Sequence, residues 1–163
     1  MTTAVYTGSF DPITLGHLNL IKRAARVFDK VIVCIMYNKD KHPLFTMEER
    51  LRQVKTVTGR FPTVEVDSSD MLVAEYARMK GAGVVVRGLR AVSDYEKECQ
   101  MALINKRLNP DLETFFLPAS EKYMYLSSSA VKELALFGAD LSAFAPREII
   151  GEIEAKFDGK GRK

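Results

Sequence analysis

The chain has 163 residues, of which 47% are hydrophobic, and a formal net charge of +3 at pH 7. These values predict a single domain with a substantial core over residues 1–157, followed by a basic tail, 158–163, that we expect to be disordered. Because the charge outside the tail is close to neutral and no apolar run approaches the length of a membrane span, we expect neither a nucleic-acid nor a membrane partner.

Two cysteines, Cys34 and Cys99, fall in a predicted strand and a predicted helix. Neither has metal-ligand spacing, so we expect reduced thiols, no disulfide and no metal held by the protein itself. The N-terminus lacks the basic region followed by an apolar region that marks a signal peptide. Together these features favour a cytoplasmic protein.

The first predicted element is a buried strand over residues 3–7, which leads through a glycine-containing loop into a helix. Gly8 lets the backbone turn and a ligand approach closely, and Asp11-Pro12 marks a turn. Residues 14–17 open the helix. Because the first N–H groups of a helix lack partners, this junction is suited to a phosphate group.

His17 lies in the first turn of this predicted helix, where a positive charge would oppose the helix dipole. One interpretation is an ordinary exposed histidine near a helix start. The other is an imidazole directed at a bound phosphate. The residues from Gly8 to Pro12, with Gly16 beside the histidine, favour the second.

Strands and helices alternate along the rest of the chain. Further strands are predicted over residues 31–36, 64–66, 84–86 and 114–117, and helices are predicted to start near Thr46, Asp70, Ser93, Ser127 and Pro146. Residues 46–49 and 93–96 match the capping box of a helix start, and Asp70 is a predicted N-cap. The alternation predicts an α/β fold: a single Rossmann-like, doubly wound domain with a five-stranded parallel sheet and helices on both faces.

Ligands of such sheets bind beyond the carboxyl ends of the strands, so the loops that follow strands are the candidate sites. The loop after the second strand, residues 37–43, carries Lys39, Lys41 and His42. A lysine there can bind a phosphate group. A solvated surface loop is the alternative.

The loop after the fourth strand carries Arg87, Gly88 and Arg90. A charge directly after a buried strand needs a partner, and two arginines beside a glycine are suited to phosphate oxygens. Glu98, further along the next helix, could hold a ribose hydroxyl or an arginine. The alternative is structural: salt bridges from the arginines to acidic residues of that helix, Asp94, Glu96 and Glu98.

The last candidate loop ends in three consecutive serines, Ser127, Ser128 and Ser129, at a predicted helix start. Their hydroxyls and the N–H groups of the helix would form a second anion site. Simple N-capping is the alternative, and one serine suffices for it.

Four segments carry a resemblance to one family. They read G-S-F-D-P-I-T-x-G-H at residues 8–17, P-x-F-T-x-E-E-R at 43–50, R-G-L-R-A-V-x-D-Y-E at 87–96 and x-S-S-S-x-V-K-E at 126–133. The first is similar to the T/H-x-G-H signature of the nucleotidylyltransferase superfamily. Together, over nearly the whole chain, they resemble the phosphopantetheine adenylyltransferases of coenzyme A biosynthesis.

The chain departs from the common family pattern at a few positions. Thr7 stands where proline is common, Ser9 where threonine is common and Leu126 where isoleucine is common. Nicotinamide or nicotinate mononucleotide adenylyltransferases usually have an arginine after the serine motif, where this chain has Lys132.

The resemblance implies two sets of substrate contacts. Those implied for ATP are Ser9, Phe10, His17, Gly88, Leu89, Arg90, Glu98, Tyr123, Met124, Tyr125, Leu126, Ser127, Ser128 and Ser129. Those implied for 4′-phosphopantetheine are Ser9, Lys41, Val73 and Arg87. The resemblance also implies Mg²⁺ held mainly by the ATP phosphates, a homohexamer, and feedback inhibition by coenzyme A.

The implied reaction joins the adenylyl group of ATP to the phosphate of the acceptor by direct in-line attack, without a covalent enzyme intermediate. The acceptor phosphate is a dianion near neutral pH and needs no general base, so catalysis is alignment and charge stabilisation. We expect His17 to act at the α-phosphate as the catalytic residue. The acceptor phosphate is assigned to Lys41, Arg87 and Ser9, and the departing phosphates to Arg90 and residues 127–129.

Three other functions remain open at this point. Another nucleotidylyltransferase would keep the mechanism with a different acceptor, such as nicotinamide or nicotinate mononucleotide or glycerol 3-phosphate. A non-catalytic adenine-nucleotide sensor could share the fold. A nucleic-acid-binding module is disfavoured by the near-neutral body and by the lack of a basic face with interleaved aromatic residues.

Overall fold

Five parallel strands form one sheet in the computed structural model, which describes residues 1–37 and 42–158. The sheet order is β3-β2-β1-β4-β5. The strands are β1 (Thr3–Gly8), β2 (Lys30–Met36), β3 (Val64–Ser69), β4 (Val84–Leu89) and β5 (Glu113–Pro118). Because β1 pairs with both β2 and β4, the chain reverses its direction of winding at β1. The predicted doubly wound parallel sheet is confirmed.

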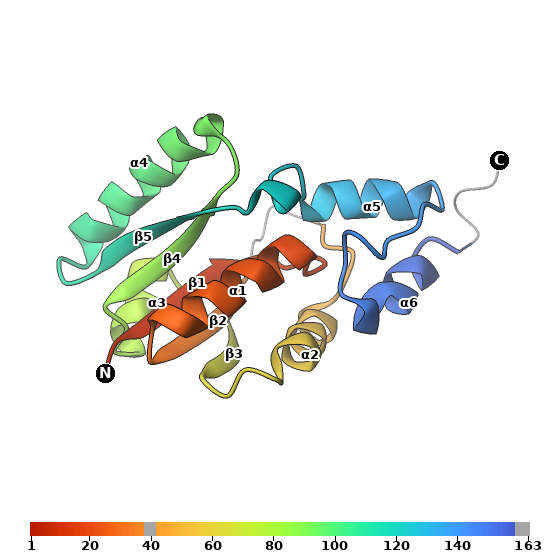
Figure 1. The fold of residues 1–163 in the computed structure, drawn as a ribbon. Helices are drawn as coiled ribbons and strands as arrows, with labels where there is room; N and C mark the ends of the chain where they lie inside the picture. The colour runs from red at the N-terminus through yellow and green to blue at the C-terminus, as the bar shows by residue number, and fades with distance from the viewer. Residues whose placement is uncertain (38–41, 159–163) are drawn as a thin grey trace.

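Six α-helices and one short 3₁₀ helix connect and extend the strands in this part of the chain (Figure 1). They are α1 (Leu15–Val27), α2 (Met47–Thr58), α3 (Val73–Met79), α4 (Val92–Leu108), η1 (Glu121–Tyr123), α5 (Ser128–Leu136) and α6 (Arg147–Ala155). Helices α5 and α6 lie beyond the sheet, on the same side as the carboxyl ends of β4 and β5 (Figure 1). Within residues 1–37 and 42–158, no helix has the length and apolar character needed to cross a membrane.

Alternating side chains of the central strands enter two separate cores, as expected for strands buried on both faces. Tyr6, Val33 and Val86 enter a core shared with apolar residues of α1, α2, α5 and α6. Val5 and Val85 point the other way, into a core that contains residues of α3. Helices therefore cover both faces of the sheet, as predicted.

Strands β3, β4 and β5 extend beyond their predicted ends. In β4 the difference affects the site, because Arg87 and Gly88 belong to the strand and pair with Phe116 and Leu117 of β5. The sequence interpretation ended the strand at its first charged residue. The parallel ladder continues past that residue because pairing depends on backbone groups, and the Arg87 side chain finds polar partners at the sheet edge.

Helix starts were predicted with mixed success. The capping box at the start of α2 is confirmed: Thr46 Oγ1 accepts from the Glu49 N–H and Glu49 Oε2 accepts from the Thr46 N–H. The capping box at residues 93–96 is wrong, because α4 already begins at Val92 with no side-chain cap. The Asp70 cap is also wrong, since α3 begins at Val73.

Both cysteines are free thiols, as expected: Cys34 is buried in the sheet and Cys99 is partly exposed on α4. Residues 159–163 of the predicted tail lie outside the described part of the chain.

Replacing Ile21 by Ala tests the packing of α1 on the sheet. Ile21 is fully buried, so the change removes apolar contacts and leaves a cavity. We expect a loss of about 2–5 kcal/mol in the free energy of unfolding, measured by urea denaturation. Lys22→Ala, on the adjacent exposed position, is the control and should change it by less than about 0.5 kcal/mol. A loss below ~1 kcal/mol for Ile21→Ala would contradict this packing.

Candidate functional site

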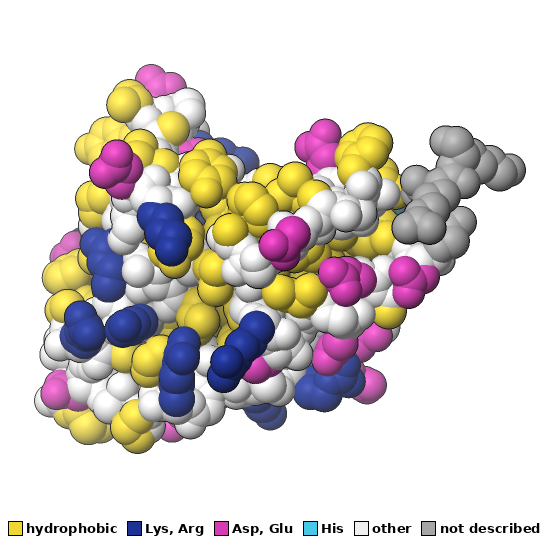
Figure 2. Space-filling model, turned by 45° about the vertical axis from the view of Figure 1, so that its right-hand side comes forward, with side chains coloured by type: hydrophobic (Ala, Val, Ile, Leu, Met, Phe, Trp, Pro, Cys, Tyr) yellow, Lys and Arg dark blue, Asp and Glu magenta, His cyan; other side chains and the backbone are white. Residues whose placement is uncertain are grey.

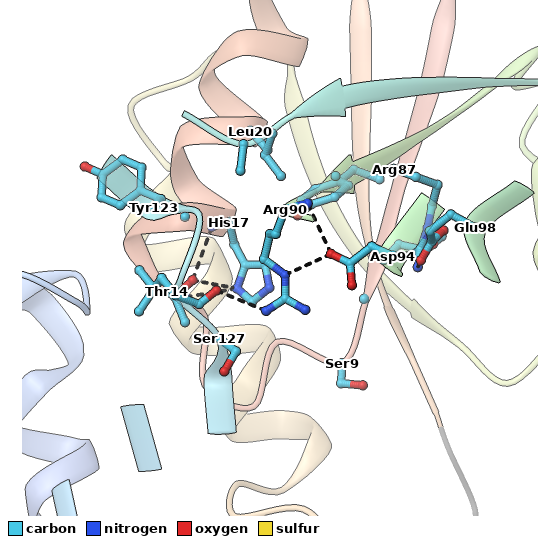
Figure 3. A pocket seen from close by; sticks show the side chains of 17 residues that line it. Ser9, Thr14, His17, Leu20, Arg87, Arg90, Asp94, Glu98, Tyr123 and Ser127 are labelled. Atoms are coloured by element: carbon cyan, nitrogen blue, oxygen red, sulfur yellow. Dashed lines mark hydrogen bonds and ion pairs between the residues drawn. The ribbon is translucent and has the colours of Figure 1, made fainter. Parts of the chain in front are cut away.

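Two adjoining cavities open at the carboxyl ends of β1 and β4. The first, of about 300 Å³, is bounded by these strand ends, the first turns of α1, and the segment from Ala119 to Ser127 (Figure 3). The second, of about 530 Å³, continues towards the start of α3 and the inner side of α4. Both lie at the point where the strand order reverses, which is where doubly wound sheets bind ligands.

His17 is held in the first cavity by the helix start it belongs to. Thr14 is the N-cap of α1: its Oγ1 accepts from the His17 N–H at 3.2 Å. In return, the Thr14 N–H donates to His17 Nδ1 at 3.1 Å. An Nδ1 that accepts a backbone hydrogen bond carries no proton, so the proton of the neutral ring is on Nε2.

The surroundings of His17 keep its imidazole neutral. Burial lowers the pKa of His17 to about 4, and the positive charges of Arg90 and Arg87 act in the same direction. The ring also packs edge-on against Phe10, with ring centroids 5.1 Å apart. His17 and Arg90 point into the same cavity (Figure 3). The site therefore offers an Nε2–H donor that stays uncharged near neutral pH.

Arg87 is fixed by acceptors on two sides. Its Nε and Nη2 donate to the two carboxylate oxygens of Glu98, at 2.6 and 2.7 Å, in a bidentate pair. Its Nη1 donates to the carbonyl oxygen and Oγ1 of Thr7, at 3.0 and 2.9 Å. Burial alone would lower the pKa of Arg87, but the Glu98 carboxylate raises it overall, so the guanidinium stays charged. Its direction is set before any substrate binds.

Arg90 has longer contacts than Arg87, with the backbone of Leu126 and with the carboxylate of Asp94. Its Nη1 donates to the carbonyl of Leu126 at 3.2 Å, and its Nε lies 3.5 Å from Asp94 Oδ2. The same carboxylate accepts from the Arg90 N–H at 3.1 Å. These contacts match the salt bridges left open as the alternative interpretation of the two arginines. Both arginines nevertheless line the cavity, so the two interpretations are compatible.

Gly88 permits a close approach between β4 and α1. A Cβ at this position would lie 2.4 Å from Cδ1 of Leu20, which is itself buried. Any larger residue would push Leu20 and the strand end apart. Gly88 and Leu20 both line the first cavity, so a larger residue at position 88 would change that lining.

The second cavity combines a polar end with an apolar wall. It shares Thr7, Gly8, Ser9, Arg87 and Glu98 with the first cavity. The rest of its lining is mostly apolar: Met36, Tyr37, Leu72, Val73, Val85, Met101, Ala102, Asn105 and Thr114. The shared residues form the boundary between the two cavities, and two of them, Arg87 and Glu98, are charged. Two molecules, one bound in each cavity, would meet at this boundary.

Most of the residues implied by the resemblance line these cavities. In the first they are Ser9, His17, Arg87, Gly88, Arg90, Glu98, Tyr123, Leu126 and Ser127. In the second they are Ser9, Val73, Arg87 and Glu98. Lys41 lies outside the described residues.

Six implied residues do not line either cavity: Phe10, Leu89, Met124, Tyr125, Ser128 and Ser129. Phe10 is buried between Tyr6 and His17. Met124 and Tyr125 are exposed. The Ser128 hydroxyl donates to the carbonyl of Pro12 at 2.8 Å, so it holds α5 against the loop after β1.

Sequence reasoning missed the roles of two residues that shape the site, Thr14 and Asn105. Thr14 was recognised only as part of a motif, although it orients the imidazole. Asp94 was named beforehand as one possible salt-bridge partner of the arginines, and it holds Arg90. Asn105, on the inner face of α4, contributes an amide to the second cavity and had no motif to mark it.

The chain resembles known proteins over most of its length. The cytidylyltransferase-like family model matches residues 5–134. A phosphopantetheine adenylyltransferase from Caldanaerobacter subterraneus subsp. tengcongensis is 52% identical over 157 residues, covering 96% of this chain and 98% of that protein. One from Clostridium tetani is 49% identical over 160 residues, covering 98% and 100%.

A solved structure shares the fold at low sequence identity. Plasmodium falciparum nicotinic acid mononucleotide adenylyltransferase, complexed with NaAD, has a TM-score of 0.68 at 13% identity, covering 97% of this chain and 96% of that one. At this identity the likeness concerns the fold alone.

An NMR titration of the His17 ring tests its protonation. We expect a midpoint near pH 4 and ¹⁵N shifts that place the proton of the neutral ring on Nε2. Since the folded pKa lies below the ordinary 6.5, the group contributes stability that is complete above pH 6.5 and is lost as pH falls towards 4. His42→Gln assigns the signals, because the chain has only two histidines. A midpoint near 6.5, or a proton on Nδ1, would contradict the geometry.

Proposed function

The chain belongs to the phosphopantetheine adenylyltransferase family, and we propose that it transfers the adenylyl group of ATP to 4′-phosphopantetheine, giving dephospho-coenzyme A and pyrophosphate. The single observation that supports this pair of substrates is the pair of cavities that share the Arg87–Glu98 boundary. The first has charged groups and two helix N-termini suited to a triphosphate. The second has the apolar wall that a pantetheine arm can cover.

The proposed reaction is a direct in-line displacement at the α-phosphorus of ATP. An oxygen of the acceptor phosphate forms the new bond to phosphorus, the bond to the bridging oxygen of the β-phosphate breaks, and pyrophosphate leaves with that electron pair. The acceptor oxygen carries no proton to remove, so no general base is needed. This agrees with a site that holds His17 neutral and offers its N–H as a donor.

Each hydrogen-bond donor of the site has a proposed role in this displacement. His17 Nε2–H stabilises the negative charge that develops at the α-phosphate. Arg87, held by Glu98 and Thr7, directs the acceptor phosphate, and Lys41 and Ser9 are proposed to assist it. Fixing these donors in advance reduces the reorganisation required in the transition state.

The departing phosphates are assigned to Arg90 and to the N-terminus of α5. Ser127 caps this helix by accepting from the Ala130 N–H, and it lines the first cavity. Ser128 is engaged with Pro12 instead. We therefore assign this anion site to the N–H groups at the start of α5 together with Ser127.

Mg²⁺ is proposed to accompany ATP. Within residues 1–37 and 42–158, no group of three or more His, Cys, Asp or Glu side chains is placed to hold a metal ion. The residues present fit an ion carried by the phosphates, whose charge it would reduce.

Assembly into a homohexamer and feedback by coenzyme A are further proposals. Helix α4 exposes Val92, Leu103 and Ile104 by 89%, 72% and 50%, and hydrophobic side chains are visible at the surface in its region (Figure 2). Exposed apolar residues on one helix support an interface with other copies. Coenzyme A contains the pantetheine arm of the acceptor, so it suits the same second cavity.

Pyrophosphate release from ATP and Mg²⁺ tests the proposed reaction. Phosphopantetheine, nicotinamide mononucleotide, nicotinate mononucleotide and glycerol 3-phosphate are offered in parallel, and we expect release with phosphopantetheine alone. Release with only another acceptor would discard the assignment of the second cavity. Absence of release with all four, while ATP still binds, would favour the adenine-nucleotide sensor.

Replacing His17 by Ala tests the role of the Nε2–H donor. We expect kcat to fall by ~10²–10³, with a much smaller change in the affinity for ATP, because the donor acts mainly on the transition state. His17 also completes the cap of α1, so the melting temperature is measured in parallel. Thr14→Ala removes the cap hydroxyl and keeps the imidazole. Turnover within a few-fold of wild type in His17→Ala would refute the assigned role.

A further inference from the structure

The carboxylate of Asp11 joins three separate parts of the chain. Asp11 follows β1, and its side chain is only 8% exposed. Its two oxygens accept from the backbone N–H groups of Leu44 and Phe45, at 2.9 and 2.8 Å, and from Nζ of Lys132 at 3.0 Å. Through these contacts the buried carboxylate holds the three segments together, and Lys132 supplies the compensating charge.

Lys132 acts together with Ser128, one turn earlier on the same face of α5. The Ser128 hydroxyl donates to the Pro12 carbonyl at 2.8 Å, next to the lysine contact with Asp11. Asp11 and Pro12, two consecutive residues of the loop after β1, are thus bound to α5. Neither Ser128 nor Lys132 is among the described residues that line the two cavities.

The fastened loop carries the residue that packs on His17. Phe10 has a φ of 46°, in the left-handed region that side chains other than glycine rarely adopt. Such a conformation persists only where neighbouring contacts fix it. Arg50 of α2 donates to the Ser9 carbonyl at 2.9 Å on one side, and Asp11 is held on the other. The Phe10 ring in turn packs against the imidazole.

We propose that Lys132 and Ser128 are positioning residues for adenylyl transfer, which fix the N-terminus of α5 against the loop at residues 9–12. The loop positions the imidazole of His17 through Phe10, and α5 presents Ser127 to the same cavity. We call the two contacts, Lys132 with Asp11 and Ser128 with Pro12, the clamp. The clamp therefore sets the distance between His17 Nε2, the donor for the α-phosphate, and the anion site for the departing phosphates. This inference rests on the proposed function.

Replacing Lys132 by Met tests the clamp by kinetics. The change leaves the Asp11 carboxylate without its charged partner and frees α5 to shift. We expect kcat to fall about tenfold to 100-fold, since a misplacement of about 1 Å has effects of this size. KM for each substrate should stay within about threefold, because Lys132 lines neither of the two proposed substrate cavities. Lys132→Arg, which can still reach Asp11, should restore most of the turnover.

Lys30→Met is the matched control. Lys30 forms a 2.7 Å ion pair with Glu65, and its side chain is 33% exposed, against 32% for Lys132. This pair lies at the opposite end of the sheet, at the start of β2. Because its partner Glu65 is 64% exposed and Asp11 only 8%, the control should lower stability by less than Lys132→Met and leave kcat unchanged. An equal fall of kcat in both variants would overturn the proposal, because the effect would then not depend on the contact between Lys132 and Asp11.

A direct contact between Lys132 and ATP predicts a different kinetic result. Loss of such a contact would raise KM for ATP about tenfold or more and leave Ser128→Ala without effect on turnover. The clamp predicts that Ser128→Ala lowers kcat in the same direction as Lys132→Met, and that the two effects are not additive in the double variant. Additive effects would contradict a shared clamp.

The NMR signals of His17 give a readout that does not depend on turnover. Lys132→Met should shift its ring signals, because the loop at residues 9–12 packs on the imidazole through Phe10, whereas Lys30→Met should not. Unchanged signals in Lys132→Met would refute the clamp even if the enzyme acts as proposed. Conversely, wild type that binds ATP but adenylylates no phosphopantetheine would refute the proposed function, and the NMR result would still decide the clamp.

Discussion

The parallel pairing of β1 on both of its edges is the constraint on which the structure depends. β1 pairs with β2 on one side and β4 on the other, so the chain must wind in opposite directions from it. The loops that leave β1 and β4 then diverge and leave a space at the carboxyl ends of the two strands. His17 comes from the first connection and Arg87 from the end of β4, and the reversal of winding brings them to one cavity.

The hydrogen-bond donors of this cavity are fixed before any substrate arrives. Arg87 is bound by Glu98 and Thr7, and His17 by the backbone of Thr14. The site contributes hydrogen-bond donors at set positions and keeps its imidazole neutral. Such an arrangement suits a displacement in which charge moves between oxygens and no proton has to be removed.

The sequence predicts what depends on local patterns. Continuous apolar runs such as residues 31–36 reveal buried strands, and the motif around His17 reveals the phosphate-binding turn. The sequence could not distinguish the roles of neighbouring residues. Ser127 faces the cavity and Ser128 faces Pro12, a difference that depends on how α5 packs against the loop after β1. Asn105 lines the second cavity because of the way α4 packs against β4 and β5, which no local motif indicates.

Direct attack by the acceptor phosphate has a stereochemical signature at the α-phosphorus of ATP. The measurement uses an ATP analogue with sulfur at one non-bridging α-oxygen, in a single known configuration, and determines the configuration of the dephospho-coenzyme A product. A single in-line displacement predicts inversion at phosphorus. Retention would mean two successive displacements through a covalent adenylyl-enzyme, and would contradict a site in which His17 and the arginines act only by alignment and charge stabilisation.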